Sequence, residues 1–330
     1  MAQSSRKVRK LGMRTLEENR FTYLSADGKT DISAKSWTDE KLEPRAILQI
    51  AHGMTEHKER YNAFARWLAK HGILVCANDH LGHGNSVTDE SNLGYMTDKN
   101  PSDVLITDMH TLREMMQEEY PDLPYFMAGH SMGSYMLRKY LAIHGEGLAG
   151  AIIMGTGHRD EGTAKVGVFI TEALARIKGW KFRSRAVQNL TYDKNYRKFD
   201  LQKKDKSNSW LSRNEDEVEK YFNDPKSGFL FTLSGHKALF EAVAFDANED
   251  NNRKIPQHLP MLMISGAEDP VGGMGKGVKA AFDLLKKTGH DNVKMKLYPG
   301  ARHELLNEIE ETKTEVYEDI LNWIMSNLRS

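Results

Sequence analysis

Residues 125–133 read Tyr-Phe-Met-Ala-Gly-His-Ser-Met-Gly and join an apolar run to a serine with a glycine on either side. The apolar run predicts a short buried strand, and the residues that follow have the spacing of a helix. A serine on such a strand-to-helix turn is typical of a nucleophile elbow, in which a strained backbone holds the hydroxyl outward. Gly129 and Gly133 fit this turn because glycine tolerates strained angles and allows strand and helix to approach closely. The segment therefore predicts Ser131 as a nucleophile at the end of a strand.

The composition is that of an ordinary globular chain, since 39% of the 330 residues are hydrophobic and 28% are charged. Basic and acidic residues number 46 each, so the net charge gives no reason to expect binding to nucleic acid. Cys76 is the only cysteine, which excludes an intrachain disulfide and favours a reducing compartment. We find neither a secretory signal nor an apolar stretch of about 18 residues, and we expect a cytoplasmic protein.

Apolar runs alternate with helical patterns along most of the chain, which predicts a parallel sheet with right-handed crossovers. Asp27-Gly28 lies between the first two runs and predicts that they form an antiparallel hairpin. The expected strands are residues 21–26, 32–38, 46–51, 73–77, 125–128, 148–155, 259–265 and 293–298. The expected helices of this part are residues 61–70, 101–119, 134–141 and 313–328. We therefore expect an α/β fold with a mostly parallel eight-stranded sheet flanked by helices.

The alternation stops after Gly157 and resumes near residue 258. Residues 157–257, which we call the insertion, are polar but include helical stretches at 166–177 and 230–244. They also contain large aromatic side chains that must pack against something: Trp180, Phe182, Trp210, Tyr221, Phe222, Phe229 and Phe231. An unstructured loop of this length is uncommon in a compact domain, so we expect a helical cap inserted into one core. The core would comprise residues 1–156 and 258–330.

A serine hydroxyl needs an imidazole to take its proton and a carboxylate to orient that imidazole. Chains with this kind of elbow carry the three groups in the order serine, acid, histidine. Here Asp269 follows the predicted strand 259–265, and His303 follows the predicted strand 293–298. Both lie at carboxyl ends of strands, where parallel sheets place their ligands. The sequence thus predicts a catalytic triad of Ser131, Asp269 and His303.

Neighbouring residues compete for these roles. Glu268 is adjacent to Asp269 and could serve as the acid, although a solvated turn residue is the simpler interpretation. His290 precedes the last strand, and we interpret it as a surface loop residue. Arg302 is next to His303 and is expected to be solvated or to contribute to packing.

The tetrahedral intermediate of acyl transfer needs two backbone N–H groups that point at its oxyanion. One should be the amide of Met132, the residue after the nucleophile. The other should be the amide of Met54, in the segment His-Gly-Met at 52–54, where Gly53 allows the backbone to approach. An ordinary strand-to-helix turn is the alternative interpretation of this segment.

Several motifs together resemble one branch of the α/β-hydrolase superfamily. They are the elbow, the segments around Asp269 and His303, His-Gly-Met-Thr-Glu-His at 52–57 with Arg60-Tyr61, and Asp-His-Leu-Gly-His-Gly-Asn-Ser at 79–86. The combination covers nearly all of the core and is similar to the monoacylglycerol lipase and lysophospholipase-like serine hydrolases, of the serine aminopeptidase S33 type. The resemblance implies an α/β-hydrolase fold and an enzyme that hydrolyses acyl esters.

The resemblance also implies roles for individual residues. It assigns the oxyanion amides to Met54 and Met132, and it implies that Glu56 and Arg60 grip a glycerol head group. Because Glu56 and Arg60 are four residues apart, an ion pair at a helix start is the alternative. The family's second histidine, three residues after the catalytic one, is replaced here by Leu306, which argues against specific recognition of glycerol.

Two further patterns have simpler interpretations. His80 and His83 are close enough in sequence for a metal site, but serine chemistry needs no metal, so we expect neither a metal nor a cofactor. Basic residues cluster at 197–206, where Asp200 and Asp205 are interspersed. A solvated surface is the main interpretation of this cluster, and transient contact of the insertion with a membrane surface is the other.

The sequence leaves three functions open. The first is a serine hydrolase for carboxylic esters of acyl chains, such as monoacylglycerols, lysophospholipids or simple esters, acting through an acyl-enzyme on Ser131. The second is a proline-type aminopeptidase on the same core, in which an acidic cluster would bind a free amine: Glu215, Asp216, Glu217 and Glu219. The third is a non-enzymatic ligand receptor, against which the intact triad weighs.

Overall fold

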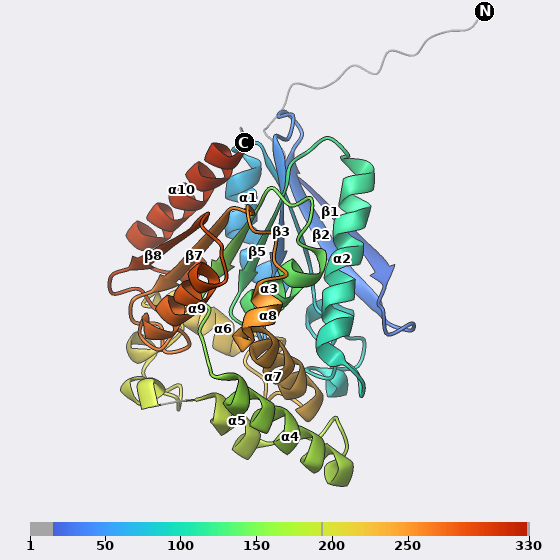
Figure 1. Ribbon diagram of the computed structural model, residues 1–330, viewed down its shortest axis with the longest axis vertical. Helices are drawn as coiled ribbons and strands as arrows, with labels where there is room; N and C mark the ends of the chain where they lie inside the picture. Colours follow the sequence, from blue (N-terminus) through green and yellow to red (C-terminus); the bar gives the residue numbers. More distant parts are fainter. Residues whose placement is uncertain (1–15, 193, 329–330) are drawn as a thin grey trace, which may run out of the picture.

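The computed structural model describes residues 16–192 and 194–328, which form a central sheet with helices on both sides (Figure 1). The strands are β1 (Leu16–Leu24), β2 (Asp31–Asp39), β3 (Ala46–Ala51), β4 (Ile73–Asn78), β5 (Tyr125–His130), β6 (Gly150–Met154), β7 (Met261–Gly266) and β8 (Val293–Tyr298). They lie side by side in the order β1-β2-β4-β3-β5-β6-β7-β8. β1 and β4 pair antiparallel with β2, and all other pairs are parallel. The expected mostly parallel eight-stranded sheet and its hairpin edge are confirmed.

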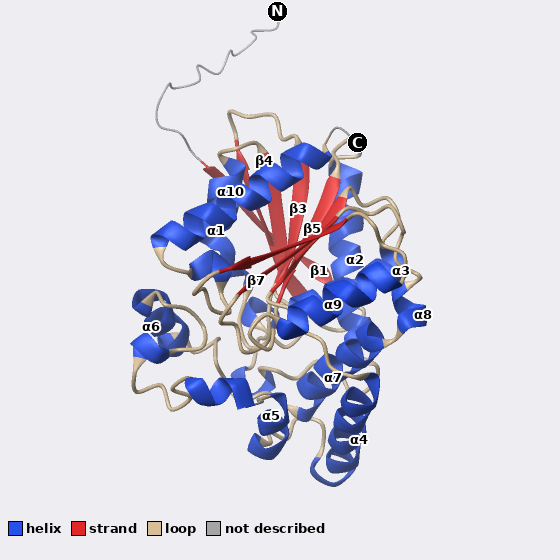
Figure 2. Cartoon of the chain, turned by 60° about the vertical axis from the view of Figure 1, so that its left-hand side comes forward, coloured by secondary structure: helices blue, strands red, loops and turns tan. Residues whose placement is uncertain are grey.

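Helices cover both faces of the sheet (Figure 2). α1 (Asn62–Ala69) and α10 (Glu310–Asn327) pack on one face, and α2 (Pro101–Glu119), α3 (Met132–His144) and α9 (Lys276–Lys287) cover the other. Every residue of β3, β4, β5, β6 and β7 is buried, as their nearly continuous apolar runs predict. Short 3₁₀ turns connect these elements: η1 (Lys58–Tyr61), η2 (Gly84–Ser86), η3 (Glu90–Asn92), η4 (Lys194–Lys198), η5 (Lys206–Asn208) and η6 (Leu305–Asn307). Across the part of the chain that the structure describes, no helix has the length and apolar character to cross a membrane.

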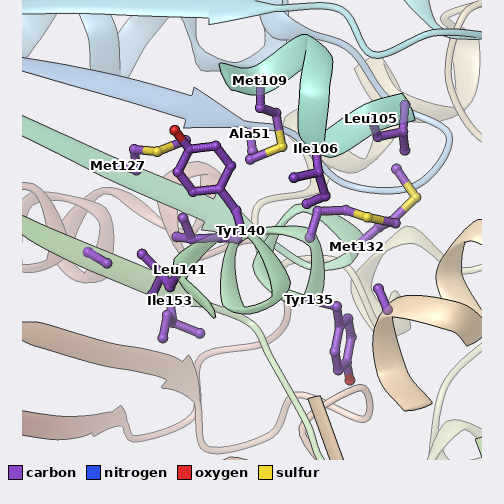
Figure 3. Packing of buried hydrophobic residues seen from close by; sticks show 14 of the residues in the cluster. Ala51, Leu105, Ile106, Met109, Met127, Met132, Tyr135, Tyr140, Leu141 and Ile153 are labelled. Atoms are coloured by element: carbon purple, nitrogen blue, oxygen red, sulfur yellow. The ribbon is translucent and has the colours of Figure 1, made fainter. Parts of the chain in front are cut away.

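The core between α2 and α3 fixes the start of α3. Figure 3 shows part of this core, in which Ile106 and Met109 of α2 lie beside Met132 and Tyr140 of α3. These four side chains are at most 2% exposed. Because Met132 directly follows Ser131 in the chain, its tight packing also fixes the position of the serine.

The insertion leaves the core after β6 and returns to it before β7. Its helices are α4 (Glu161–Lys178), α5 (Arg185–Thr191), α6 (Glu215–Asn223), α7 (Leu233–Ala247) and α8 (Glu249–Asn252). α7 packs against α2 and α3 of the core, and α4 packs on α7 farther from the sheet (Figure 1). Side-chain oxygens at the helix starts accept backbone N–H bonds and so define where four of these helices begin: Asp160, Ser184, Asn214 and Thr232.

The predicted bounds hold best where the apolar pattern is long. α2, β3 and β8 match the predicted residues, whereas α10 begins three residues earlier than expected. α9 was not predicted, although Val278, Ala281 and Leu285 have helical spacing and are fully buried.

The interpretation of His290 as a surface residue is wrong, because its side chain is fully buried. Its Nε2 atom is 3.1 Å from the Ile255 carbonyl oxygen, and its Nδ1 atom is 3.1 Å from that of Leu285. The imidazole therefore joins the end of α9 to the end of the insertion. A single sequence contains no local signal for such a long-range bond.

Candidate active site

Ser131 lies on the turn between β5 and α3 with backbone angles φ 53° and ψ −120°. Such angles are costly for a residue with a Cβ and are retained at functional turns. A Cβ on Gly133 would lie 2.1 Å from the carbonyl oxygen of Ala51, and one on Gly129 would lie 2.3 Å from that of Gly133. Neither glycine has a positive φ. The glycines thus serve the close approach of strand and helix, and the strained angles expected of them fall on Ser131 instead.

Asp269 and His303 meet at the carboxyl ends of β7 and β8. His303 Nδ1 is 3.0 Å from Asp269 Oδ2, and both side chains are almost completely buried. The Asp269 carboxylate also accepts hydrogen bonds from the Ser265 hydroxyl at 3.1 Å and the Val271 amide at 2.8 Å. Glu268 is exposed, as its interpretation as a turn residue predicts. The geometry can hold one tautomer of the imidazole with Nε2 directed away from Asp269.

Ser131 and His303 line the same pocket. Among the described residues, no hydrogen bond joins the two side chains. Without substrate, the bond between a nucleophile and its base is often longer than in the reacting complex. The structure therefore brings the three predicted triad residues to one place and forms one of the two bonds that the chemistry needs.

The amides of Met54 and Met132 lie on either side of Ser131. Met132 is the first residue of α3, so its N–H has no acceptor within the helix. Within the described ranges, no acceptor takes the Met54 amide either. A Cβ on Gly53 would lie only 3.0 Å from the Ser131 Cβ atom, so the β3–α1 loop packs directly on the serine. Two unpaired N–H donors next to a nucleophile can stabilise an oxyanion.

The Glu56 carboxylate fixes the loop that contains Met54. Its Oε1 atom accepts the Gly53 amide at 2.5 Å and the Tyr61 hydroxyl at 2.9 Å, and it lies 3.1 Å from His130 Nδ1. Burial favours the neutral acid, but the hydrogen bond and charge of His130 and the nearby Arg60 lower the pKa of Glu56 to about 2 overall. The carboxylate is therefore ionised at neutral pH and restrains the residue before Met54.

Arg60 forms the ion pair that was the alternative interpretation of its spacing. Its Nε atom is 3.3 Å from Glu56 Oε2, and its Nη2 atom is 2.5 Å from Glu304 Oε2. Its guanidinium also stacks over the Tyr221 ring at 4.8 Å. Glu56 lines the pocket at Ser131, and Arg60 does not. Of the two residues expected to contact a head group, only Glu56 is placed to do so.

His52, His80 and His83 form a buried cluster behind the same loop. The His80 amide donates to His52 Nε2 at 2.9 Å, and the Thr55 amide points at His83 Nε2 at 3.4 Å. Burial lowers the pKa of His80 to about 3 and that of His83 to about 4, so both are neutral at pH 7. The described residues contain no group of three or more ligand-type side chains placed for a metal. The cluster can support the loop through neutral hydrogen bonds.

Two pockets meet at Ser131. One is apolar, has a volume of about 240 Å³ and lies between α3, α4 and α7. Its apolar lining includes Met132, Tyr135, Ala164, Gly167, Ile170, Leu239, Phe240 and Val243. The other has a volume of about 120 Å³ and contains Glu56, His130, Lys203, Tyr221 and Glu304 among its polar residues. The serine therefore lies where an apolar compartment meets a smaller and more polar one, which we call the polar pocket.

The sequence did not reveal three residues of this site. Glu304 follows His303 directly, and its spacing to Arg60, 244 residues away, gives no local signal. Tyr221 and Trp210 were recognised only as aromatic residues in need of packing, yet both line the polar pocket. The positions of these residues depend on contacts between segments that are far apart in the sequence.

Comparisons with known proteins bear on the fold and the family of this chain. A model of the family described as serine aminopeptidase S33 matches residues 42–310. The chain is 30% identical over 286 residues to monoglyceride lipase of Homo sapiens, with 85% of this chain and 82% of that protein covered. It is 28% identical over 301 residues to monoacylglycerol lipase of Mycolicibacterium smegmatis, with 88% and 92% covered. A solved carboxyl esterase from Bacillus coagulans, in complex with glycerol, matches with a TM-score of 0.86 and 34% identity over 95% of this chain and 100% of that one.

The fold and these relatives define a serine ester hydrolase with the α/β-hydrolase fold. Within that class, the chain belongs to the serine aminopeptidase S33 family, whose model spans most of its length. The relatives compared above are lipases and esterases by name. Neither the aminopeptidase nor the non-catalytic receptor is favoured.

Proposed function

We propose that this enzyme hydrolyses esters between a medium or long acyl chain and a small polar alcohol, with monoacylglycerols as the substrate class. The observation that supports this proposal is the position of Ser131 between a larger apolar pocket and a smaller polar one. An ester whose carbonyl lies at Ser131 would place its acyl chain in the first pocket and its alcohol in the second. The lipases and the glycerol-bound esterase among the relatives support the same class of substrate.

In the proposed mechanism, Ser131 Oγ attacks the ester carbonyl and His303 Nε2 takes its proton. Asp269 holds the tautomer through the 3.0 Å contact with Nδ1 and stabilises the imidazolium that forms. The amides of Met54 and Met132 stabilise the oxyanion. His303 then gives the proton to the departing alcohol, and the reverse sequence with water releases the fatty acid from Ser131.

We further propose that the insertion is the cap of the acyl pocket, with domain limits near residues 156 and 258. α4 and α7 touch over the pocket, because a Cβ on Gly167 would lie 2.9 Å from the Phe240 ring. Ile170 of α4 and Leu239 of α7 add aliphatic surface to the pocket wall. An acyl chain enclosed by these helices would lose its contact with water, and each buried methylene contributes about 0.8 kcal/mol.

The chain-length profile follows from this cap. We expect kcat/KM for p-nitrophenyl esters to rise from acetyl to decanoyl, because each added methylene finds apolar surface until the pocket is full. The measurement is initial-rate kinetics below the critical micelle concentration of each ester. A flat or falling profile from acetyl onward would indicate an esterase for short acyl groups instead.

Glu56 is proposed as a positioning residue for the oxyanion hole, in place of the substrate contact that the resemblance implies. We expect Glu56→Gln to lower kcat/KM by on the order of 10-fold to 100-fold, because the amide loses the charge that strengthens the three contacts at Oε1 and would place an NH₂ group against the Arg60 guanidinium. The measurement compares the decanoyl esters of p-nitrophenol and of glycerol. Equal loss with both alcohols indicates positioning, whereas a loss confined to the glycerol ester indicates substrate contact.

Glu59 provides the matched control for this variant. It lies in the same segment and is ion-paired to Lys35 at 2.9 Å, but it lines neither pocket. Glu59→Gln should leave both substrates unaffected. A comparable loss in the control would attribute the effect to folding of the 56–62 segment.

The aminopeptidase alternative requires an acidic site for the substrate amine near Ser131. The acidic cluster of α6 is not among the residues that line the two pockets at Ser131. Glu215, Asp216 and Glu219 are exposed, and Glu217 is partly exposed and ion-paired to Lys220. A substrate amine at Ser131 would therefore find no support from this cluster.

We propose that the insertion touches a lipid surface while it takes up substrate. Val166 and Leu190 are 56% and 53% exposed, yet both also line the acyl pocket, so the pocket opens onto an apolar surface. Phe169 and Ile177 extend this surface and are 67% and 78% exposed. Basic side chains of α4 and the following turn, at 165, 176, 178 and 181, suit an anionic membrane.

The double variant Phe169→Ser/Ile177→Ser is expected to bind phosphatidylglycerol-containing vesicles several-fold more weakly, because it removes two exposed apolar anchors. Hydrolysis of soluble p-nitrophenyl butyrate should not change. The measurement is vesicle co-sedimentation, with Leu24→Ser as the control, since Leu24 is 58% exposed on β1. Equal binding by the wild type and the double variant would contradict the proposal.

A cytoplasmic location is also proposed, and its support is the cysteine content. Cys76 is fully buried next to the Tyr125 hydroxyl, and burial raises the pKa of its thiol to about 12. A single buried thiol of this kind is neither reactive nor able to form an intrachain disulfide. A chain with one buried cysteine and no disulfide is typical of proteins in a reducing compartment.

A further inference from the structure

Residues 207–213 of the insertion form a strap that is bound to the loop carrying His303. The Arg302 guanidinium donates to the carbonyl oxygens of Ser207, Ser209 and Ser212 at 2.9, 2.6 and 3.3 Å. The Glu304 amide adds a bond to the Leu211 carbonyl oxygen at 2.7 Å. These bonds span ninety or more residues of sequence and couple the strap to the active-site loop.

A second anchor holds the far end of the strap. The fully buried Glu308 carboxylate accepts hydrogen bonds from the Arg302 amide at 2.9 Å and from Arg213 Nε at 3.0 Å. The Ser212 hydroxyl donates to the Asn307 carbonyl oxygen at 2.8 Å. Because bonds fix both ends, the residue in the middle of the strap has a defined position relative to His303.

That residue is Trp210. Its indole ring packs on the His303 imidazole, with ring centroids 5.1 Å apart and planes inclined by 37°. The indole also packs against the Tyr196 ring, at a centroid distance of 5.4 Å. Trp210 lines both the apolar pocket and the polar pocket. The indole therefore lies where the two compartments would otherwise join.

We propose that Trp210 is a specificity-determining residue that separates the acyl compartment from the alcohol compartment and so restricts the leaving alcohol to a small one. This inference rests on the proposed function, because it assigns the two pockets to the two halves of the ester. With the indole in place, the alcohol has only the pocket of about 120 Å³. Without it, an alcohol with a bulky apolar group could extend toward the apolar pocket.

Met54 and Tyr192 also line both pockets, but they are less suited to this role. Met54 belongs to the oxyanion loop, and its side chain is flexible. Tyr192 lies at the end of α5, and among the described residues no hydrogen bond joins it to the loop that carries His303. Trp210 combines a large rigid ring with a support that is hydrogen-bonded to the active-site loop.

The test compares two substrates that share the acyl chain and the glycerol backbone, one of which carries a benzyl ether in place of a hydroxyl: the decanoyl ester of glycerol and that of 1-O-benzylglycerol. The measured quantity is the ratio of kcat/KM for the benzyl ester to kcat/KM for the glycerol ester. We expect Trp210→Ala to raise this ratio on the order of 10-fold over the wild type, with Trp210→Leu and Trp210→Phe giving smaller increases in that order. Trp180→Phe is the control, since Trp180 lies in the insertion but lines neither pocket.

Thermal midpoints and fluorophosphonate labelling show whether each variant is folded. If Trp210→Ala does not fold, Trp210→Leu and Trp210→Phe provide the test in its place. A ratio unchanged within about twofold in folded variants, even with lower activity on both esters, would overturn the role of Trp210. The wild type tests the proposed function separately. If it cleaves neither decanoyl ester, the proposed function fails, whatever the variants do.

Discussion

Ser131→Ala is expected to lower kcat for ester hydrolysis by on the order of 10⁵-fold to 10⁶-fold and to abolish labelling by a fluorophosphonate probe. The reason is that the hydroxyl oxygen of Ser131 is the atom that would form the acyl-enzyme. Ser134, three residues later, donates its hydroxyl to the Ser131 carbonyl oxygen at 2.6 Å and is buried in α3. It cannot replace Ser131 without breaking that bond.

The Ser131→Ala protein should remain folded, because the Ser131 side chain is only partly buried and forms no hydrogen bond among the described residues. Thermal unfolding and intact-mass spectrometry after probe treatment check both halves of the prediction. Ser134→Ala serves as the matched control and should keep its labelling. Labelling of the Ser131→Ala protein at another serine would contradict the assignment.

Much of the core could be predicted because its signals are local. β3, β4 and β5 are buried on both faces, so their sequences are continuous apolar runs that leave little choice of structure. The elbow is also local, since strand, serine and helix lie within a few residues of one another. The proposed triad acid and base could be found because each lies within a few residues of the carboxyl end of a strand.

The parts that the sequence did not reveal depend on contacts between distant segments. Trp210 is placed by bonds from Arg302, whose role as a donor to three carbonyl oxygens has no sequence pattern. The position of His290 before the last strand favours a surface loop, but its side chain is buried and contacts the carbonyl oxygens of Leu285 and Ile255. Glu56 and Arg60 illustrate an intermediate case. Their spacing indicated an ion pair, whereas the bond from Glu56 to Gly53 became evident only in three dimensions.

Asp269→Asn is expected to lower kcat by on the order of 10²-fold to 10⁴-fold, whereas Glu268→Gln should change it by less than about twofold. Asp269 accepts bonds at both oxygens: Oδ2 is 3.0 Å from His303 Nδ1, and Oδ1 accepts the Val271 amide at 2.8 Å. An asparagine has one oxygen and one NH₂ group, so it can satisfy only one of these donors. If the oxygen stays with Val271, the NH₂ group faces His303 and favours the tautomer that cannot take the proton from Ser131.

The two variants form a matched pair, because each replaces a carboxylate with its amide at adjacent positions. They differ in burial, since Asp269 is fully buried and Glu268 is exposed. Steady-state kinetics with p-nitrophenyl decanoate should show the loss mainly in kcat for Asp269→Asn, with KM nearly constant, because the acid contacts the imidazole and not the substrate. A large loss in Glu268→Gln with little loss in Asp269→Asn would show that the acid is Glu268 and that the bond between Asp269 and His303 is only structural.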